Sequence, residues 1–323
     1  MPLMFDMPLE ALKTYQGTNP RPHDFETFWD TRLAEMRDID PQVEFQPAEF
    51  QTSFAECFHL FYTGVGGARI HAKYLRPRVP PSIPHPAVLM FHGYSANAGD
   101  WFSKLPYVAS GFAVAALDCR GQGGLSEDTG GVVGNTRLGH IIRGLDGPPE
   151  KMLFCQVFLD TAQLAQIVMD IPEIDANRIG TMGGSQGGGL SLVCAALEPR
   201  IKRAAPVFPF LCDYRRVWDI DLDVDAYQEL RQYFRMFDPL HEREDEVFTK
   251  LGYIDVQHFC YRIKGRVNMA VGLMDQICPP STQFAAYNKI QSPKSMAVYP
   301  DYGHEFELSQ LHSDRVYDFL SEL

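Results

Sequence analysis

One serine between glycines, in Gly183-Gly184-Ser185-Gln186-Gly187, has the clearest chemical meaning in the sequence. The pentapeptide has the spacing G-x-S-x-G, follows a strand-type run at 178–182 and precedes small residues at 188–197 that favour a helix. Glycine tolerates the backbone angles of so tight a turn, which leaves the serine hydroxyl exposed. Free N–H groups at the start of the helix favour a negative charge beside it. We therefore predict that Ser185 is a nucleophile; the alternative is a glycine-rich turn with an incidental serine.

Two later residues could activate this serine, in the chain order serine, acid, histidine. Asp275 follows the apolar strand-type run 266–272, and His304 follows a glycine on the loop after the next short strand. The carboxyl ends of strands in an open α/β sheet are where such sites form. A serine hydroxyl needs an imidazole to take its proton, and the imidazole needs a carboxylate to fix its tautomer. We predict that His304 is the base and Asp275 the acid, with Asp301 as the alternative acid.

Two backbone amides are candidates to stabilise the oxyanion that such a reaction forms. One belongs to Gln186, the residue after the nucleophile. The other belongs to Tyr94, which follows the almost wholly apolar run 86–91 in the sequence His92-Gly93-Tyr94. We predict that both N–H groups donate to the oxyanion. The alternative for Tyr94 is an apolar residue that only covers the site.

Residues 120–124 are rich in glycine, which is also typical of phosphate-binding loops. This run lacks the G-x-x-x-x-G-K-[ST] pattern and its lysine, so it does not indicate nucleotide binding. The run instead predicts a sharp turn in which Arg120 ties loops together. Direct participation of Arg120 in catalysis is the alternative.

The elements around these residues indicate an α/β-hydrolase fold, with a mostly parallel twisted sheet flanked by helices. From residue 86 onward, strand-type and helix-type segments alternate, which favours parallel strands. Alternating patterns predict an antiparallel start to the sheet at 43–45, 56–62 and 68–75. Helices are predicted at 24–37, capped by Asp24, and at 150–170, with one apolar stripe and a start at Pro148 and Pro149.

We predict one hydrolase domain over 1–323 with two additions. Residues 1–40 form an N-terminal helical extension. Residues 208–262 interrupt the alternation and carry many aromatic side chains, acids and arginines. We predict that this segment is a helical insertion that narrows access to Ser185. The alternatives are a helical decoration far from the site and an oligomer contact.

Composition limits the possible partners. The chain has 323 residues, 45% of them apolar, and a formal net charge of −12, which argues against nucleic acid and anionic membranes as partners. Seven cysteines without C-x-x-C spacing predict reduced core thiols and no zinc site. No signal peptide and no span of about 20 apolar residues is recognisable. We expect a cytoplasmic protein that needs no metal or organic cofactor.

The sequence also resembles the acetyl xylan esterases and cephalosporin C deacetylases of carbohydrate esterase family seven. The marks are Arg120-Gly121-Gln122, the pentapeptide around Ser185, and His304-Glu305, together with an opening stretch from Met7 to Trp29 and His92-Gly93-Tyr94. The resemblance implies that Arg120 and Gln122 support the site structurally. It also implies small-molecule acetyl ester substrates and a homo-hexameric ring whose sites open on an internal cavity.

Together these features predict a serine esterase that removes acetyl groups from acetylated xylo-oligosaccharides and cephalosporin C through an acetyl-enzyme. A general short-chain carboxylesterase would use the same triad. A peptidase of the same fold is a further alternative, although the chain has no propeller-like repeat. A non-enzymatic binding protein on this fold would not require serine, acid and histidine in this order.

Overall fold

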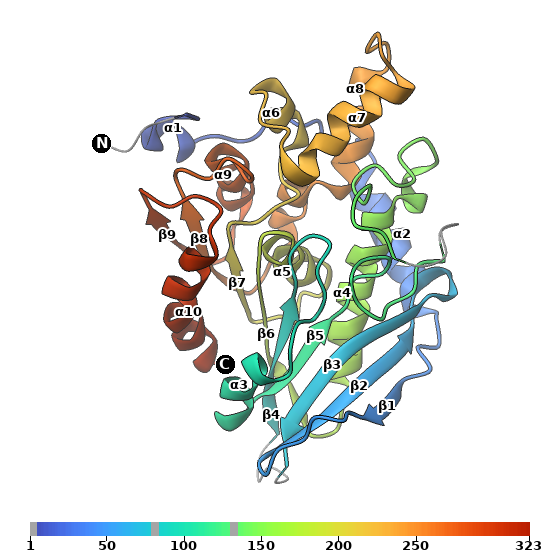
Figure 1. Cartoon of the computed structure of the whole chain (residues 1–323), viewed down its shortest axis with the longest axis vertical. Coiled ribbons are helices and arrows are strands. Elements are labelled where there is room, and N and C mark those ends of the chain that lie inside the picture. Colours follow the sequence, from blue (N-terminus) through green and yellow to red (C-terminus); the bar gives the residue numbers. More distant parts are fainter. Residues whose placement is uncertain (1–4, 79–83, 130–134) are drawn as a thin grey trace.

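The computed structural model describes residues 5–78, 84–129 and 135–323, so the first four residues of the predicted N-terminal extension lie outside the description (Figure 1). Within these ranges the strands form one nine-stranded sheet in the order β1-β2-β3-β5-β4-β6-β7-β8-β9. Side chains that alternate along the central strands enter two separate cores. Leu89 of β4 joins the core that α4 and α5 cover, and Val88 joins the core beneath α3 and α10. The sheet therefore lies between two helical layers.

The sheet begins with the predicted antiparallel segment. Its strands are β1 (Glu44–Pro47), β2 (Ala55–Thr63) and β3 (Arg69–Pro77). Strand β2 pairs antiparallel with both β1 and β3, and β3 pairs antiparallel with β5. Burial alternates along most of β2, in keeping with the alternating pattern of its sequence.

The other six strands are parallel, as the alternation of strand and helix predicts. They are β4 (His85–Phe91), β5 (Ala113–Leu117), β6 (Ile174–Gly184), β7 (Arg203–Val207), β8 (Arg266–Gly272) and β9 (Lys294–Tyr299). All five residues of β5 are buried, which explains its unbroken apolar sequence. Because these strands run the same way, the loops at their carboxyl ends meet at one edge of the sheet.

Ten α-helices lie within the described ranges. They are α1 (Leu9–Leu12), α2 (Phe25–Arg37), α3 (Leu105–Ala109), α4 (Leu153–Met169), α5 (Gln186–Leu197), α6 (Tyr214–Asp219), α7 (Gln228–Phe237), α8 (Glu244–Leu251), α9 (Pro280–Lys289) and α10 (Phe306–Ser321). Short 3-10 turns occupy Val65–Gly67, Phe102–Lys104, Pro149–Lys151, Asp225–Tyr227, Gly252–Ile254, Val256–His258 and Cys260–Arg262. No helix in the described part of the chain combines the length and apolarity that a membrane crossing requires.

Two details of the predicted helices were wrong. Asp24 precedes α2 but makes no capping bond with its side chain; its carboxylate instead accepts a hydrogen bond from the Tyr253 hydroxyl at 2.6 Å. Helix α4 begins only at Leu153, after a 3-10 turn, and is buried on nearly all sides rather than along one stripe. Tertiary partners that the local sequence does not reveal explain both differences: the Tyr253 hydroxyl, and the helices that enclose α4.

The segment between β7 and β8 contains α6, α7, α8 and four of the 3-10 turns. Figure 1 shows these three helices together beyond the end of the sheet at which β6 runs into α5. This is the end where the parallel strands finish, so the segment lies beside the turn that carries Ser185. Whether the segment narrows access to Ser185 stays a prediction.

Candidate active site

Ser185 occupies the turn between β6 and α5 in a backbone conformation that is unfavourable for a residue with a Cβ. Its φ is 57° and its ψ is −122°. Such angles persist only where neighbouring structure enforces them. The N–H of Ser185 donates to the Val207 carbonyl at 3.0 Å, and its carbonyl accepts from the Phe210 N–H at 3.0 Å. The neighbouring strand end thus fixes the turn and directs the hydroxyl outward.

The glycines around Ser185 are required by close backbone contacts. A Cβ at Gly187 would collide with the Phe91 carbonyl at the end of β4, and a Cβ at Gly183 would collide with Gly187 and with the same carbonyl. Neither position has room for a side chain. The G-x-S-x-G pattern therefore has the steric cause that the sequence suggested.

The structure brings Ser185, His304 and Asp275 into one chain of hydrogen bonds. His304 Nε2 lies 3.0 Å from Ser185 Oγ, and His304 Nδ1 lies 2.9 Å from Asp275 Oδ2. Asp275 is fully buried, and its Oδ1 accepts the N–H groups of Ile277 at 3.0 Å and Cys278 at 2.8 Å. The loop after β8 therefore holds the carboxylate rigidly behind the imidazole. Asp301, the alternative acid, is exposed at the surface, and Asp275 takes the position beside Nδ1.

The two amides predicted to bind an oxyanion lie at the ends of β4 and β6. Gln186 is the first residue of α5, so its N–H has no acceptor within the helix. Tyr94 lines the same pocket as Ser185 and His304. No hydrogen bond between described residues occupies the Tyr94 N–H. Both amides are thus free to donate, and their role as an oxyanion hole stays a prediction.

Gln122 connects the loops that carry these amides. Its Oε1 accepts the Ser95 N–H at 2.9 Å, and its carboxamide pairs with that of Gln186. Gln122 and Gln186 are both fully buried. Gln122 therefore fixes the residue next to Tyr94 and the residue next to Ser185 at the same time.

Arg120 lies in the fold beneath the site. Its guanidinium is fully buried and binds both carboxylate oxygens of Asp160 in α4, at 2.7 and 2.6 Å. It also donates to the Val65 carbonyl at 2.9 Å and to Gln156 at 2.6 Å. These partners belong to α4 and the 3-10 turn at Val65–Gly67. Arg120 thus ties loops to a helix and does not reach Ser185.

A pocket of about 910 Å³ opens over Ser185. Its walls come from the loops after β4 and β5, from the segment between β7 and β8, and from the loops that carry Ile277 and His304. The lining residues are Gly93, Tyr94, Ser95, Ala96, Gly123, Asn135, Thr136, Arg137, Leu138, Ser185, Phe210, Asp225, Ala226, Gln228, Ile277 and His304. Polar side chains on the walls, with the serine among them, suit a ligand that carries hydroxyl groups.

The sequence did not indicate two residues that lie beside the site. Glu229 of α7 contacts Tyr94 through its side chain. Cys278 is fully buried next to Asp275, and with Asp275 and His304 it places three potential metal ligands within 4.8 Å of one another. Burial raises the pKa of the Cys278 thiol well above its ordinary value, which opposes the thiolate that a metal needs. Asp275 and His304 already bind each other, so we assign no metal to this group.

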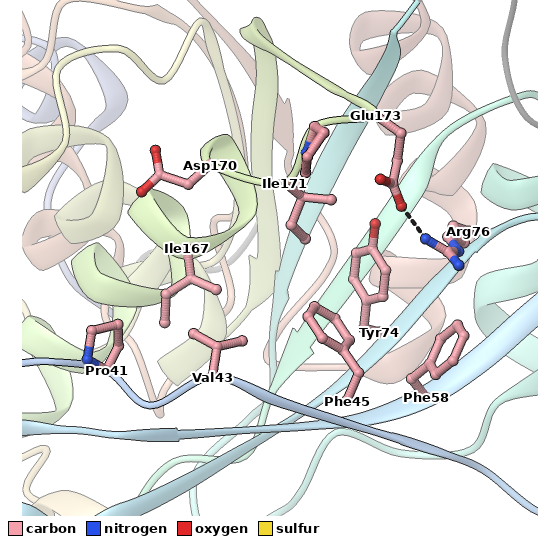
Figure 2. A pocket seen from close by; sticks show the side chains of 11 residues that line it. Pro41, Val43, Phe45, Phe58, Tyr74, Arg76, Ile167, Asp170, Ile171 and Glu173 are labelled. Carbon is pink, nitrogen blue, oxygen red and sulfur yellow. Dashed lines mark hydrogen bonds and ion pairs between the residues drawn. The ribbon is translucent and has the colours of Figure 1, made fainter.

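A second pocket, of about 450 Å³, lies on the antiparallel side of the sheet between β1–β3 and the end of α4. Figure 2 shows Phe45, Phe58 and Tyr74 along its floor and the ion pair between Arg76 and Glu173 at one side. It contains none of the residues predicted to react. The pocket over Ser185 is therefore the candidate active site.

A nine-stranded, mostly parallel sheet between helical layers, with a serine on the tight turn between β6 and α5, defines an α/β-hydrolase. The chain belongs to the acetyl xylan esterase (AXE1) family, whose model matches residues 1–323. It is a carboxylic ester hydrolase.

Three relatives show how far the similarity extends. Acetyl xylan esterase 1 from Thermoanaerobacterium sp. JW/SL YS485 is 61% identical with a TM-score of 0.94, covering 98% of this chain and 99% of that one. The acetyl xylan esterase from Paenibacillus sp. R4 is 36% identical with a TM-score of 0.91 and the same coverage, 98% and 99%. The acetyl esterase Axe7A of Xylanibacter ruminicola is 27% identical over 301 residues, 90% of this chain. These residues span only 64% of Axe7A.

Proposed function

We propose that this protein removes acetyl groups from small acetylated substrates through a triad of Ser185, His304 and Asp275. The continuous hydrogen-bond chain from Asp275 through His304 to Ser185 Oγ supports this proposal. It places a buried carboxylate, an imidazole and a half-buried hydroxyl that lines the pocket in the order that nucleophilic catalysis requires.

The mechanism follows from this geometry. Ser185 Oγ attacks the acetyl carbonyl carbon while His304 Nε2 takes the hydroxyl proton. The carbonyl oxygen becomes negative and accepts hydrogen bonds from the N–H groups of Tyr94 and Gln186. His304 then returns the proton to the departing alcohol oxygen, which leaves an acetyl group on Ser185. Water, deprotonated by His304, attacks the acyl carbon; the bond to Ser185 Oγ breaks, acetate is released, and His304 returns the proton to Oγ.

Acetylated xylo-oligosaccharides and cephalosporin C are the substrates we propose. Membership of the acetyl xylan esterase family and the names of the relatives support an acetylated sugar. Polar side chains on the pocket walls, among them Asn135, Arg137 and Asp225, offer partners for the hydroxyl groups of such an alcohol. A general short-chain carboxylesterase is the second candidate, because the same triad would serve it; a peptidase of this fold is a more distant one.

Hydrolysis of a p-nitrophenyl ester series from acetate to octanoate tests the proposal. We expect rates to fall steeply beyond acetate and Ser185→Ala to lose at least about a thousandfold in kcat. A flat or rising profile would favour the general esterase. Near-normal turnover by folded Ser185→Ala would remove this serine from the mechanism. Release of acetate from acetylated xylo-oligosaccharides and from cephalosporin C, each measured directly, then identifies the alcohol.

The assembly is a separate proposal that rests on the resemblance to carbohydrate esterase family seven alone. We propose a homo-hexameric ring with sites that open inward, which would admit small esters and exclude polymers. Light scattering of the purified protein tests the mass. Comparison of acetylated oligosaccharides with polymeric acetyl xylan tests the exclusion.

A further inference from the structure

Glu229 is a buried acid with an unusual set of partners. It lies in the first turn of α7, is 1% exposed, and forms no ion pair with a described residue. Its Oε1 accepts hydrogen bonds from the Tyr94 hydroxyl and from the Gly139 N–H at 2.6 Å, and its Oε2 accepts the Ile141 N–H at 2.9 Å. Burial raises the pKa of Glu229, and these hydrogen bonds act in the opposite direction. Among the described residues, the hydrogen-bond donors to this carboxyl group are all neutral.

The bond to Glu229 holds the free end of the Tyr94 side chain. The same Tyr94 hydroxyl accepts the His140 N–H at 3.1 Å. The ring packs edge-on against His140 and Phe210, with centroid distances of 5.0 and 5.7 Å. Since the ring is held at its tip by hydrogen bonds and packs against two other rings, the backbone of Tyr94 has little freedom beside Ser185. The Tyr94 side chain therefore anchors its own backbone amide.

The same carboxyl group also holds one wall of the pocket. Gly139 directly follows residues 135–138, which line the pocket, and Ile141 lies two residues further on. The Ser95 hydroxyl donates to the Arg137 carbonyl, so the loop with Tyr94 and the wall are joined a second time. Glu229 is thus the point at which α7, the wall and the loop after β4 meet.

We propose that Glu229 is a positioning residue that aligns the Tyr94 amide for the oxyanion and sets the pocket wall at 135–138. The inference rests on the proposed function, and it assigns a task to the segment between β7 and β8. Glu229 touches neither the reacting ester nor the triad; it acts through Tyr94. A carboxyl group suits this position because its two oxygens can accept three donors, whereas a glutamine would turn an NH₂ group toward one of the backbone N–H groups.

Glu229→Gln and Tyr94→Phe test the proposal in the full-length protein. Tyr94→Phe removes the hydroxyl but keeps the backbone amide. Because removal of a direct oxyanion donor costs about 10²–10³ in kcat, we expect each variant to lose about 10- to 100-fold in kcat on p-nitrophenyl acetate. KM should change less than kcat. A trifluoromethyl ketone, which forms a tetrahedral adduct with the serine, should bind more weakly by a similar factor.

The double variant separates positioning from simple stabilisation. If Glu229 acts through Tyr94, the kcat of the double variant should be no lower than that of the less active single variant. Glu246→Gln, on the exposed surface of α8, is the matched control and should leave kcat unchanged. Circular dichroism and thermal unfolding show whether each variant is folded at the assay temperature.

Two results would overturn the inference. One is a folded Glu229→Gln whose kcat and ketone affinity lie within about twofold of the parent. The other is a double variant whose losses multiply. If Glu229→Gln does not fold, Tyr94→Phe decides alone, because an unchanged kcat there removes the link to the oxyanion. A wild-type esterase activity that survives Ser185→Ala would instead overturn the proposed function, and this inference with it.

Discussion

The carboxamides of Gln122 and Gln186 form a buried pair beneath the pocket. Gln122 Nε2 donates to Gln186 Oε1 at 2.9 Å, and Gln186 Nε2 lies 3.1 Å from Gln122 Oε1. Because Gln122 Oε1 also accepts the Ser95 N–H, one side chain joins the turn after β5, the loop after β4 and the serine turn. Neither glutamine contacts the reacting groups through its side chain. The pair therefore affects catalysis only through the position of the loops.

Replacement of Gln122 by alanine should lower kcat by about 10- to 100-fold with a smaller change in KM, because both predicted oxyanion amides lose a support. Steady-state kinetics on p-nitrophenyl acetate measures this. Gln46→Ala, on the exposed strand β1, is the matched control and should leave the kinetics unchanged. A Gln122→Ala variant with normal kcat would show that the loops hold their positions without the pair.

Asp275→Asn should lower kcat by about 10⁴-fold, since an amide cannot hold His304 in the tautomer that leaves Nε2 free to accept a proton. The hydrogen bonds from Ile277 and Cys278 to Oδ1 can persist, so the loop after β8 should stay folded. Asp301→Asn changes the exposed alternative acid and should leave kcat intact. Comparable losses in both variants would contradict the assignment of Asp275.

Arg120 and Asp160 form a fully buried ion pair, so removal of one partner leaves an uncompensated charge. Arg120→Met should lower the free energy of unfolding by about 3–5 kcal/mol, measured by denaturant titration. Arg120→Met combined with Asp160→Leu should recover much of this loss. Lys13→Met, which breaks an exposed pair with Glu10, should cost no more than about 1 kcal/mol. A double variant less stable than Arg120→Met would contradict this account.

Much of the site could be predicted from local sequence because each part follows a recognisable strand. Ser185, Asp275 and His304 come from loops far apart in the chain, yet parallel strands bring their carboxyl ends to one edge. The order of the residues and the turn chemistry were enough to place them. The parallel strands could be predicted for the same reason, since burial on both faces leaves an unbroken apolar sequence.

Side-chain contacts made by the segment between β7 and β8 could not be predicted. Glu229 is 135 residues from Tyr94, and nothing in the sequence of α7 distinguishes it from a solvated acid. The sequence context of Asp24 is typical of a helix cap, but its carboxylate accepts a hydrogen bond from the hydroxyl of Tyr253, 229 residues away. Such pairs depend on how the segment between β7 and β8 packs, and local propensity carries no information about that packing.

Asp118, directly after β5, should make the stability of the protein depend on pH. It is buried, and it accepts hydrogen bonds from His71 at 2.6 Å, from the Ala98 N–H at 2.6 Å and from the Leu125 N–H at 2.9 Å. Burial alone would raise the pKa of Asp118, but these bonds outweigh it and hold the pKa below its usual value of 3.8. A carboxyl group with a lowered pKa stabilises the fold above its unfolded pKa. This contribution to stability is lost as the pH falls from the pKa of the unfolded state through the lower pKa of Asp118 in the folded protein.

Asp118→Asn should therefore lower the free energy of unfolding by about 1.5–3 kcal/mol at pH 7, the usual contribution of hydrogen bonds to a charged group. The difference from the parent should shrink below pH 3.8, where the unfolded parent also takes up the proton. Urea titrations of both proteins at pH 7 and at successively lower pH measure this difference in the free energy of unfolding. Asp245→Asn, at an exposed position of α8, is the control and should show little difference at either pH. A gap between Asp118→Asn and the parent that stays constant through this range would mean that the ionised carboxylate is not the stabilising form.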